Sequence, residues 1–216
     1  MTQRQDQPVI RPITEADVPA AVDTLTRAFT GYPYIRHVLA ADGHEERIRR
    51  LHELQTRTGM AYGRVWVAED CRAVAVWHTP DQDLSSAHEE IGRQAVEILG
   101  DRLAALVLAE QAVEPHLPQE PTWFLDSVGV APDSRGRGLG RAVLAPGMAA
   151  AAREGRPAFL ATATERNVRF YEGLGFRVTA ELALPGNGPR TWCMRKDPGP
   201  RTGRGTRFRL PWTRGR

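Results

Sequence analysis

Apolar residues along the chain follow two spacings, one typical of strands and one typical of helices. The segment from Val18 to Phe29 has apolar residues every three or four positions, and Thr14 with Asp17 forms a capping-box pattern just before it. Residues 64–68 and 73–77 are two apolar runs separated by a short polar turn, which predicts a β-hairpin. The first part of the chain therefore predicts a strand, an amphipathic helical region and a hairpin.

The remaining patterns extend this alternation to about residue 196. Strands are expected at residues 9–13, 64–68, 73–77, 123–130, 158–162, 176–184 and 191–196. Helices are expected at residues 18–29, about 45–60, 138–154 and 166–173, with a helical insert within residues 81–118. Pro146 should kink the helix at 138–154. The order β-α-α-β-β-(helical insert)-β-α-β-α-β-β indicates an α/β fold whose mixed central sheet has six to seven strands and flanking helices.

Composition and charge narrow the class of protein. The chain has 216 residues, 41% of them apolar, which fits one globular domain with a sizeable core. Its net charge is +3, but six arginines and no acidic residue follow Asp197, so the preceding residues are mildly acidic. A nucleic-acid partner is therefore not expected for the folded part, and the arginine tail is the one segment through which nucleic acid could bind. We expect a flexible segment at 1–8, a folded domain at 9–197 and a disordered basic tail at 198–216.

Cysteine usage and hydropathy exclude further classes. Cys71 and Cys193 are far apart and belong to no Cys/His cluster, so we expect buried, reduced thiols and no metal site. The first residues lack the apolar core of a secretion signal, and no apolar run has the length of a membrane span. A cytoplasmic location is expected.

The most informative stretch runs from Ser127 to Arg141, where an apolar strand enters a glycine-rich turn and then a helix. Glycines at 136, 138 and 140 leave backbone N–H groups unobstructed, and arginines stand at 135, 137 and 141. Such a turn at a helix N-terminus is suited to a pyrophosphate. It lacks the Lys-Ser/Thr ending of a P-loop, and the next strand does not end in the acidic residue of a dinucleotide site. A purely structural turn is the alternative.

Two motifs resemble those of the Gcn5-related N-acetyltransferase (GNAT) family. They are Arg-x-x-Gly-x-Gly, which starts at Arg135, and Asn-x-x-Phe-Tyr-x-x-x-Gly-Phe, which starts at Asn167. The resemblance implies the GNAT fold, acetyl-CoA as co-substrate, and a strand before the turn that splays from its neighbour and offers its N–H groups to the cofactor. The cofactor contacts implied in this way belong to Val128, Gly129, Val130, Arg135, Gly136, Arg137, Gly138, Leu139, Gly140, Arg141 and Asn167.

The resemblance also implies a general acid. Tyr171 occupies the position of the family's tyrosine that faces the thioester sulfur. A phenol, with a pKa of about 10, can protonate a departing thiolate. The alternative role for Tyr171 is packing on an amphipathic helix.

Asp126 is the candidate base. It interrupts an otherwise apolar strand, and a buried acidic residue needs a partner or a function. Its position corresponds to that of a catalytic base in some members of the family, so Asp126 is expected to take the proton of the acceptor amine, directly or through water. A structural carboxylate satisfied by an arginine or by the backbone is the alternative.

Four further stretches resemble the branch of the family that acetylates aminonucleoside antibiotics and so confers resistance. They lie at residues 64–70, 73–80, 157–160 and 188–194. This resemblance implies the primary amine of puromycin or a related aminonucleoside as the acceptor. That branch has a glutamate where this chain has Ala161 and no acid at the position of Asp126, which suggests that the carboxylate has moved across the sheet.

The acceptor pocket is expected between the first helical region and the insert. Tyr32 and Tyr34 carry rings that can stack on a nucleobase or a methoxyphenyl ring, and His78 is a further pocket candidate. Loop packing is the alternative for the tyrosines, and a structural role is the alternative for the histidine.

Two other functions remain open at this stage. One is the same transfer to another small amine or to a protein N-terminus. The other is a non-catalytic module that binds acyl-CoA and docks on RNA through the arginine tail. The complete glycine turn and the presence of Tyr171 favour an enzyme. The sequence leaves the oligomeric state open.

Overall fold

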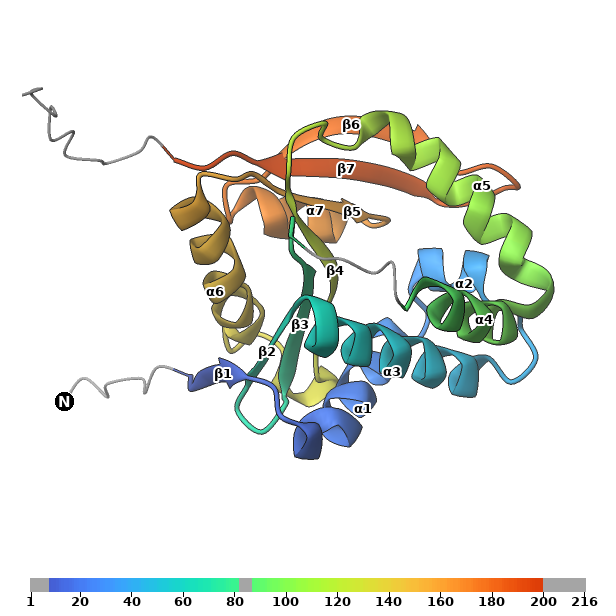
Figure 1. The fold of residues 1–216 in the computed structure, drawn as a ribbon, viewed down its shortest axis with the longest axis horizontal. Helices are drawn as coiled ribbons and strands as arrows, with labels where there is room; N and C mark the ends of the chain where they lie inside the picture. Colours follow the sequence, from blue (N-terminus) through green and yellow to red (C-terminus); the bar gives the residue numbers. More distant parts are fainter. Residues whose placement is uncertain (1–7, 82–86, 200–216) are drawn as a thin grey trace, which may run out of the picture.

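The computed structural model describes residues 8–81 and 87–199, which form a seven-stranded mixed sheet with helices on both faces (Figure 1). This confirms the expected α/β architecture. The strands are β1 (Ile10–Pro12), β2 (Arg64–Ala68), β3 (Ala73–His78), β4 (Trp123–Val130), β5 (Ala158–Thr162), β6 (Arg177–Ala183) and β7 (Arg190–Lys196). The helices are α1 (Val18–Phe29), α2 (Pro33–Val38), α3 (His44–Tyr62), α4 (His88–Leu99), α5 (Leu103–Val113), α6 (Leu139–Glu154) and α7 (Glu165–Glu172).

The strands lie in the order β1-β2-β3-β4-β5-β7-β6. Neighbouring strands are antiparallel except β4 and β5, which are parallel. Each strand begins and ends within one residue of its predicted position. The predicted helices are present as well, and α6 continues unbroken through Pro146.

Helix α2 is an element that the sequence prediction missed. No helix was expected between residues 29 and 45, and Gly31 does adopt a left-handed backbone with φ of 81° that ends the preceding helical region. Pro33, however, starts a helix, because its fixed φ suits the first helical position and no N–H partner is needed there. The consequence is that Tyr32 and Tyr34 sit at the start of a helix rather than in an irregular loop.

The two faces of the sheet have separate cores. Helices α6 and α7 pack on one face, where the fully buried Trp77 lies beneath Gly147 of α6. A side chain at Gly147 would come within 2.5 Å of the Trp77 ring, so this close helix–sheet contact requires glycine. Helices α1 and α3 pack on the other face over Val74 and Val76 of β3 (Figure 1).

The insert between β3 and β4 forms a third, smaller core. The segment was expected to be helical, and the described part consists of α4, α5 and short 3-10 turns. Ile98 and Leu99 of α4 pack with Ile35 of α2 and Ile48 of α3. Tyr32 and Tyr34 lie at the edge of this cluster, so the insert and the first helical region do meet where the acceptor pocket was expected.

The gap between β4 and β5 is the feature of the sheet that matters for function. Trp123 pairs with Ala158 and Phe124 with Phe159, and the pairing stops there although both strands continue. The splay implied by the family resemblance is therefore present.

Other expectations have mixed outcomes. Cys71 and Cys193 are both buried and free. The predicted flexible start and basic tail fall almost wholly outside the described residues. Within residues 8–81 and 87–199, no helix has the length and apolar content needed to cross a membrane. The same residues contain no cluster of His, Cys, Asp and Glu arranged to hold a metal ion.

Candidate functional site

The glycine turn between β4 and α6 presents a row of unpaired backbone donors. Gly136 and Gly138 both have φ of 79°, a left-handed conformation that other residues adopt at a cost. Among the described residues, no acceptor meets the backbone N–H groups of residues 135–141. The Leu139 side chain points into the core, so this residue contributes its N–H group alone. An anion such as a pyrophosphate fits this turn at the helix N-terminus.

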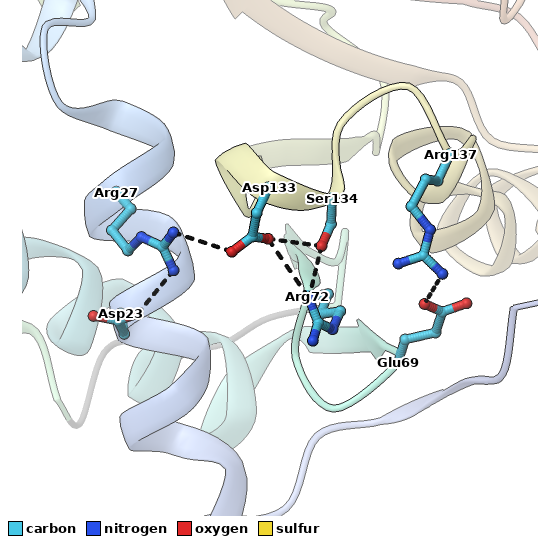
Figure 2. Close-up of polar contacts among 7 residues, drawn as sticks. All are labelled: Asp23, Arg27, Glu69, Arg72, Asp133, Ser134 and Arg137. Carbon is cyan, nitrogen blue, oxygen red and sulfur yellow. Dashed lines mark hydrogen bonds and ion pairs between the residues drawn. The ribbon is translucent and has the colours of Figure 1, made fainter.

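The three arginines of the turn differ in their contacts. Arg137 donates to Glu69 at 2.8 Å (Figure 2), and Arg141 donates to the carbonyl oxygen of Gly173 at 3.1 Å. Arg135 is exposed and forms no ion pair with any described residue. Arg135 is therefore the arginine with no competing ion pair when a phosphate arrives, whereas Arg137 shares one guanidinium nitrogen with Glu69.

A network of side chains supports the turn from the side of α1 and the β2–β3 hairpin. Figure 2 shows Asp133 between Arg27 of α1 and Arg72, with Arg72 also donating to Ser134 at 3.0 Å. The Ala131 N–H group donates to the Arg72 carbonyl oxygen at 2.8 Å. These contacts hold the strand end and the start of the turn in one position.

The hairpin that supplies Glu69 and Arg72 is itself strained. Glu69, Asp70 and Cys71 all have positive φ, of 43°, 52° and 65°. Each such residue costs about 1–2 kcal/mol relative to its usual backbone. Local contacts hold the strained turn, because Glu69 N–H donates to Val9 and the Cys71 thiol donates to the Asp17 carbonyl oxygen. The strain lies beside the anion-binding turn, where Glu69 contacts Arg137.

The edge of β4 that faces the gap offers further donors. Since Ala131 N–H points toward β3 and successive N–H groups alternate between the two edges of a strand, those of Val128 and Val130 point toward β5. None of the described strands pairs with them there. Gly129, whose added Cβ would lie 3.0 Å from Leu25 and Ala28, packs against α1 and points its N–H toward β3.

Tyr171 lies on α7, beside the start of α6. It is 6% exposed and makes edge-on ring contacts with Phe170 and Phe176. Burial, together with the nearby Tyr32, raises the pKa of Tyr171 above its usual value, so the phenol stays protonated at neutral pH. Its hydroxyl group forms no hydrogen bond with a described residue. A protonated phenol whose hydroxyl group has no hydrogen-bond partner among the described residues has the properties of a general acid.

Tyr32 was expected in the acceptor pocket and Asn167 in the cofactor site. In the structure both residues lie at the end of β5. The Tyr32 hydroxyl accepts from Ala163 N–H at 2.8 Å and lies 3.0 Å from the Thr162 hydroxyl. Asn167 donates its side-chain amide to the same Thr162 oxygen at 3.1 Å. The three residues tie α2, β5 and α7 together next to Tyr171. The hydroxyl of Tyr32 is thus engaged, and its ring packs on Phe29.

Asp126 stands at a β-bulge in β4. Ser127 pairs with Val76 of β3 and Leu125 with Trp77, so Asp126 has no partner on β3. A bulge bends the strand and redirects the extra side chain. Here the side chain reaches α3, where Gln55 Nε2 donates to Asp126 Oδ1 at 3.4 Å. The bulge was not predicted from the sequence, and in the structure β4 still alternates between buried and partly buried residues.

Two of the predicted pocket residues gather around Asp126. His78 Nε2 lies 3.7 Å from Asp126 Oδ1, with the two side chains 30% and 17% exposed. Tyr34 is partly buried, and burial first, then Glu110, Asp126 and Tyr32, raises the pKa of its phenol. Asp126 Oδ2 is buried and has no hydrogen-bond partner among the described residues. The arginine that would make Asp126 a structural carboxylate is absent from the described residues around it.

Three residues near Asp126 were missed by sequence reasoning. Gln55 and His52 lie on α3, and Glu110 lies on α5. Burial raises the pKa of Glu110 above its usual value. His52 is 1% exposed and lies one helical turn after the buried Ile48, so a histidine on the apolar face of the expected helix was the available signal.

Comparison with known proteins places these features in context. A family model described as the acetyltransferase (GNAT) family matches residues 65–176, about half of the chain. The matched range contains β4, the glycine turn and Tyr171, but not Tyr32, Tyr34, His52 or Gln55.

Solved structures of acetyltransferases have the same fold. A structure described as histone acetyltransferase HPA2 and related acetyltransferase, from Corynebacterium glutamicum, is 28% identical with a TM-score of 0.70, and the match covers 91% of this chain and 99% of that one. Arylalkylamine N-acetyltransferase 2 from Aedes aegypti is 13% identical with a TM-score of 0.60 over 89% and 99%. A putative acetyltransferase from Salmonella typhimurium, solved with acetyl-CoA, is 18% identical with a TM-score of 0.53 over 92% and 98%.

Proposed function

This chain belongs to the acetyltransferase (GNAT) family, and from that premise we propose that it transfers the acetyl group of acetyl-CoA directly to the primary amine of puromycin or a related aminonucleoside. The observation that carries the transfer is the convergence on one gap in the sheet. Unpaired N–H groups of the glycine turn and of β4, the protonated Tyr171 and the carboxylate of Asp126 all belong to elements that border the divergence of β4 from β5.

The residues fit acetyl-CoA, which supplies an activated acetyl thioester when bound. The N–H groups of residues 135–141 fit its pyrophosphate, and those of Val128 and Val130 fit an extended chain running along the edge of β4. An N–H group near Val128 is the candidate donor to the oxygen that gains charge during transfer. Arg135 adds a positive charge that has no competing ion pair among the described residues.

The transfer needs two proton movements, and the chain has a group for each. The acceptor nitrogen forms a bond to the acetyl carbon while the carbon–sulfur bond breaks. Asp126 takes the proton that the amine loses, directly or through water, and Tyr171 gives a proton to the departing thiolate. The α-amino group of an aminoacyl acceptor has a pKa of about 8, so a carboxylate gives enough assistance near neutral pH.

The choice of acceptor rests on the stretches similar to puromycin N-acetyltransferase. These include residues 73–80 in β3 and residues 188–194 in β7, the two strands that flank the β4–β5 pair. Acetylation would neutralise the amine and so blunt an antibiotic that mimics aminoacyl-tRNA. The departure at Ala161 and Asp126 means that the candidate base belongs to β4 rather than to β5.

A second candidate acceptor is a more cationic small amine. Burial first, and then the charges of Glu110 and Asp126, raise the pKa of the Tyr34 phenol, so two carboxylates border the expected pocket. Two carboxylates favour an acceptor with a second positive charge. One structure with the same fold is described as an agmatine N-acetyltransferase, which makes agmatine a suitable probe.

The test is release of CoA thiol from acetyl-CoA with a panel of acceptors: puromycin, N-acetylpuromycin, agmatine and a peptide with N-terminal alanine. We expect the highest kcat/KM with puromycin and none with N-acetylpuromycin, whose amine is blocked. A higher kcat/KM for agmatine would support the cationic amine instead, and a higher value for the peptide would support a protein N-terminus. Binding of acetyl-CoA without thiol release for any amine in a broad panel would contradict catalysis and leave the acyl-CoA-binding module.

A further inference from the structure

We propose that His52 is a positioning residue for Asp126: it orients the side-chain amide of Gln55 so that the amide NH2 group, and not the amide oxygen, faces the carboxylate. The inference rests on the proposed role of Asp126 as base. It goes beyond that role by assigning two residues of α3 that lie outside the range matched by the family model.

The geometry defines a chain of contacts from α3 to β4. His52 Nδ1 lies 2.9 Å from Gln55 Oε1. A carbonyl oxygen has no proton to give, so Nδ1 is the donor and carries the hydrogen. The other end of the same amide, Gln55 Nε2, donates to Asp126 Oδ1 at 3.4 Å. His52 and Gln55 are three residues apart on one helix, where side chains meet on the same face.

Burial keeps the imidazole in the required state. His52 is 1% exposed, and its ring contacts the ring of Phe29 with centroids 4.7 Å apart. Burial lowers the pKa of His52 to about 4, so at neutral pH the ring is uncharged and carries a single proton. A proton on Nε2 would be a buried donor without an acceptor among the described residues, so the proton is favoured on Nδ1 whichever way the amide points. His52 Nε2 is buried without a partner among the described residues, so no other contact competes for it.

The orientation of the amide matters because its two ends have opposite polarity but nearly the same shape. The observed orientation places a donor against Asp126 and stabilises the carboxylate. The reversed orientation would place an oxygen against a carboxylate oxygen, which favours the protonated acid and removes the base. His52 selects the first orientation, because its Nδ1–H group requires an acceptor.

Other groups also face Asp126 and set the background for a pH measurement. Among the described residues they are His78 of β3, His52 of α3 and Tyr34 of α2, with Glu110 of α5 facing Tyr34. His78 is present in every variant, so its contribution cancels when variants are compared. The comparison therefore isolates the effect of His52 and Gln55.

The test replaces the donor in two ways. His52→Asn keeps an N–H donor bonded to Cγ, as Nδ1 is, whereas His52→Leu removes the donor and keeps an apolar side chain. Gln55→Met removes the amide at a partly buried position and provides a second route if the leucine variant does not fold. The carboxyl carbon of Asp126 is followed by NMR in 13C-labelled protein across pH, a measurement that needs no acceptor.

We expect His52→Leu and Gln55→Met each to move the midpoint of the Asp126 titration upward by about 0.5–1 pH unit relative to wild type, since each removes the hydrogen bond to the ionised form. His52→Asn should stay within about 0.2 pH unit of wild type. The double variant His52→Leu/Gln55→Met should shift no further than either single variant, because both break one chain of contacts. An unchanged midpoint in Gln55→Met, or equal shifts in the asparagine and leucine variants, would overturn the proposal.

The kcat/KM profile with an acceptor separates this inference from the proposed function. If wild type turns over puromycin, the acidic limb of the profile should move with the NMR midpoint, with an unchanged KM for acetyl-CoA. If no amine is acetylated but the midpoints behave as expected, the proposed function fails and the positioning role stands. If puromycin is acetylated and the midpoints do not differ, the function stands and the positioning role fails.

Discussion

The glycine turn and the cluster around Asp126 are built in opposite ways. The turn comes from one continuous stretch, is exposed, and presents backbone N–H groups whose directions follow from two left-handed glycines. The cluster assembles side chains from α2, α3, β3 and β4, is mostly buried, and depends on a bulge and on the orientation of one amide. The turn can hold an anion through local geometry alone, whereas the cluster acquires its chemistry only when distant elements pack together.

The largest expected effect comes from the phenol of Tyr171, the candidate general acid. Tyr171→Phe should lower kcat by about 100-fold or more, because the general acid is lost while the ring stays in place. The dissociation constant for acetyl-CoA should not change, as measured by calorimetry. Tyr62→Phe, at the end of α3, is the matched control. A kcat near wild type would assign Tyr171 to packing instead.

The cluster around Asp126, unlike the glycine turn, should make the free energy of unfolding depend on pH in the mildly acidic range. Because burial lowers the pKa of His52 from 6.5 to about 4, the unfolded state takes up its proton first as pH falls. The contribution of the uncharged His52 to the free energy of unfolding is therefore fully present above pH 6.5 and is lost as the pH falls from about 6.5 to 4. A shift of this size corresponds to a loss of about 3 kcal/mol. His37, whose pKa burial also lowers, adds in the same direction.

Urea denaturation at a series of pH values measures this loss. His52→Asn should remove the His52 share of the slope and keep that of His37. A slope in the asparagine variant equal to that of wild type would contradict the assignment.

A side chain added at a glycine of the turn should weaken the binding of acetyl-CoA and have no other effect on the reaction. Gly138→Val forces a branched residue into φ of 79°, which strains the turn that presents the donors, so we expect the affinity for acetyl-CoA to fall about 30-fold. Gly155→Val is a closely matched control, because Gly155 ends the same helix with φ of 68° far from the donors. Equal losses of affinity in both variants would show that the effect is general strain.

The loss of kcat/KM on removing the Asp126 carboxylate should become smaller as the pH rises. Asp126→Asn should lower kcat/KM about 10-fold or more near pH 7, where the amine is mostly protonated, and much less near pH 9. The acetyl-CoA dissociation constant should stay unchanged, which distinguishes the cluster from the turn. The same loss at both pH values would rule out the role of base.

The smallest effect is expected from breaking the ion pair between Arg137 and Glu69. Glu69→Gln frees Arg137, so acetyl-CoA should bind up to about fivefold more tightly at low salt, the limit for such exposed pairs. The gain should fade at high salt. Glu97→Gln, which breaks the pair with Arg50 between α3 and α4, is the control and should leave the affinity unchanged. Weaker binding would mean that Glu69 holds Arg137 in its productive position.

Local patterns predicted most of the fold because strand and helix signals in this chain are short-range. The alternation of Trp123 to Val130, the glycines around Gly138 and the helix after them depend on neighbours in sequence, and their predicted bounds match the structure. The exception, α2, depends on how Pro33 is used, since proline is equally compatible with a turn and with the first position of a helix.

The family, the order of the elements and the donor-bearing turn could be inferred from the sequence, which also made Tyr171 and Asp126 the candidate acid and base. The groups that surround these two side chains follow from how the elements pack. The bulge that turns Asp126 toward Gln55, the burial that keeps His52 uncharged, and the pairing of Arg137 with Glu69 all join residues distant in sequence. Backbone conformation is governed by near neighbours, while the environment of a side chain is created when separate elements pack, so the first can be read along the chain and the second cannot.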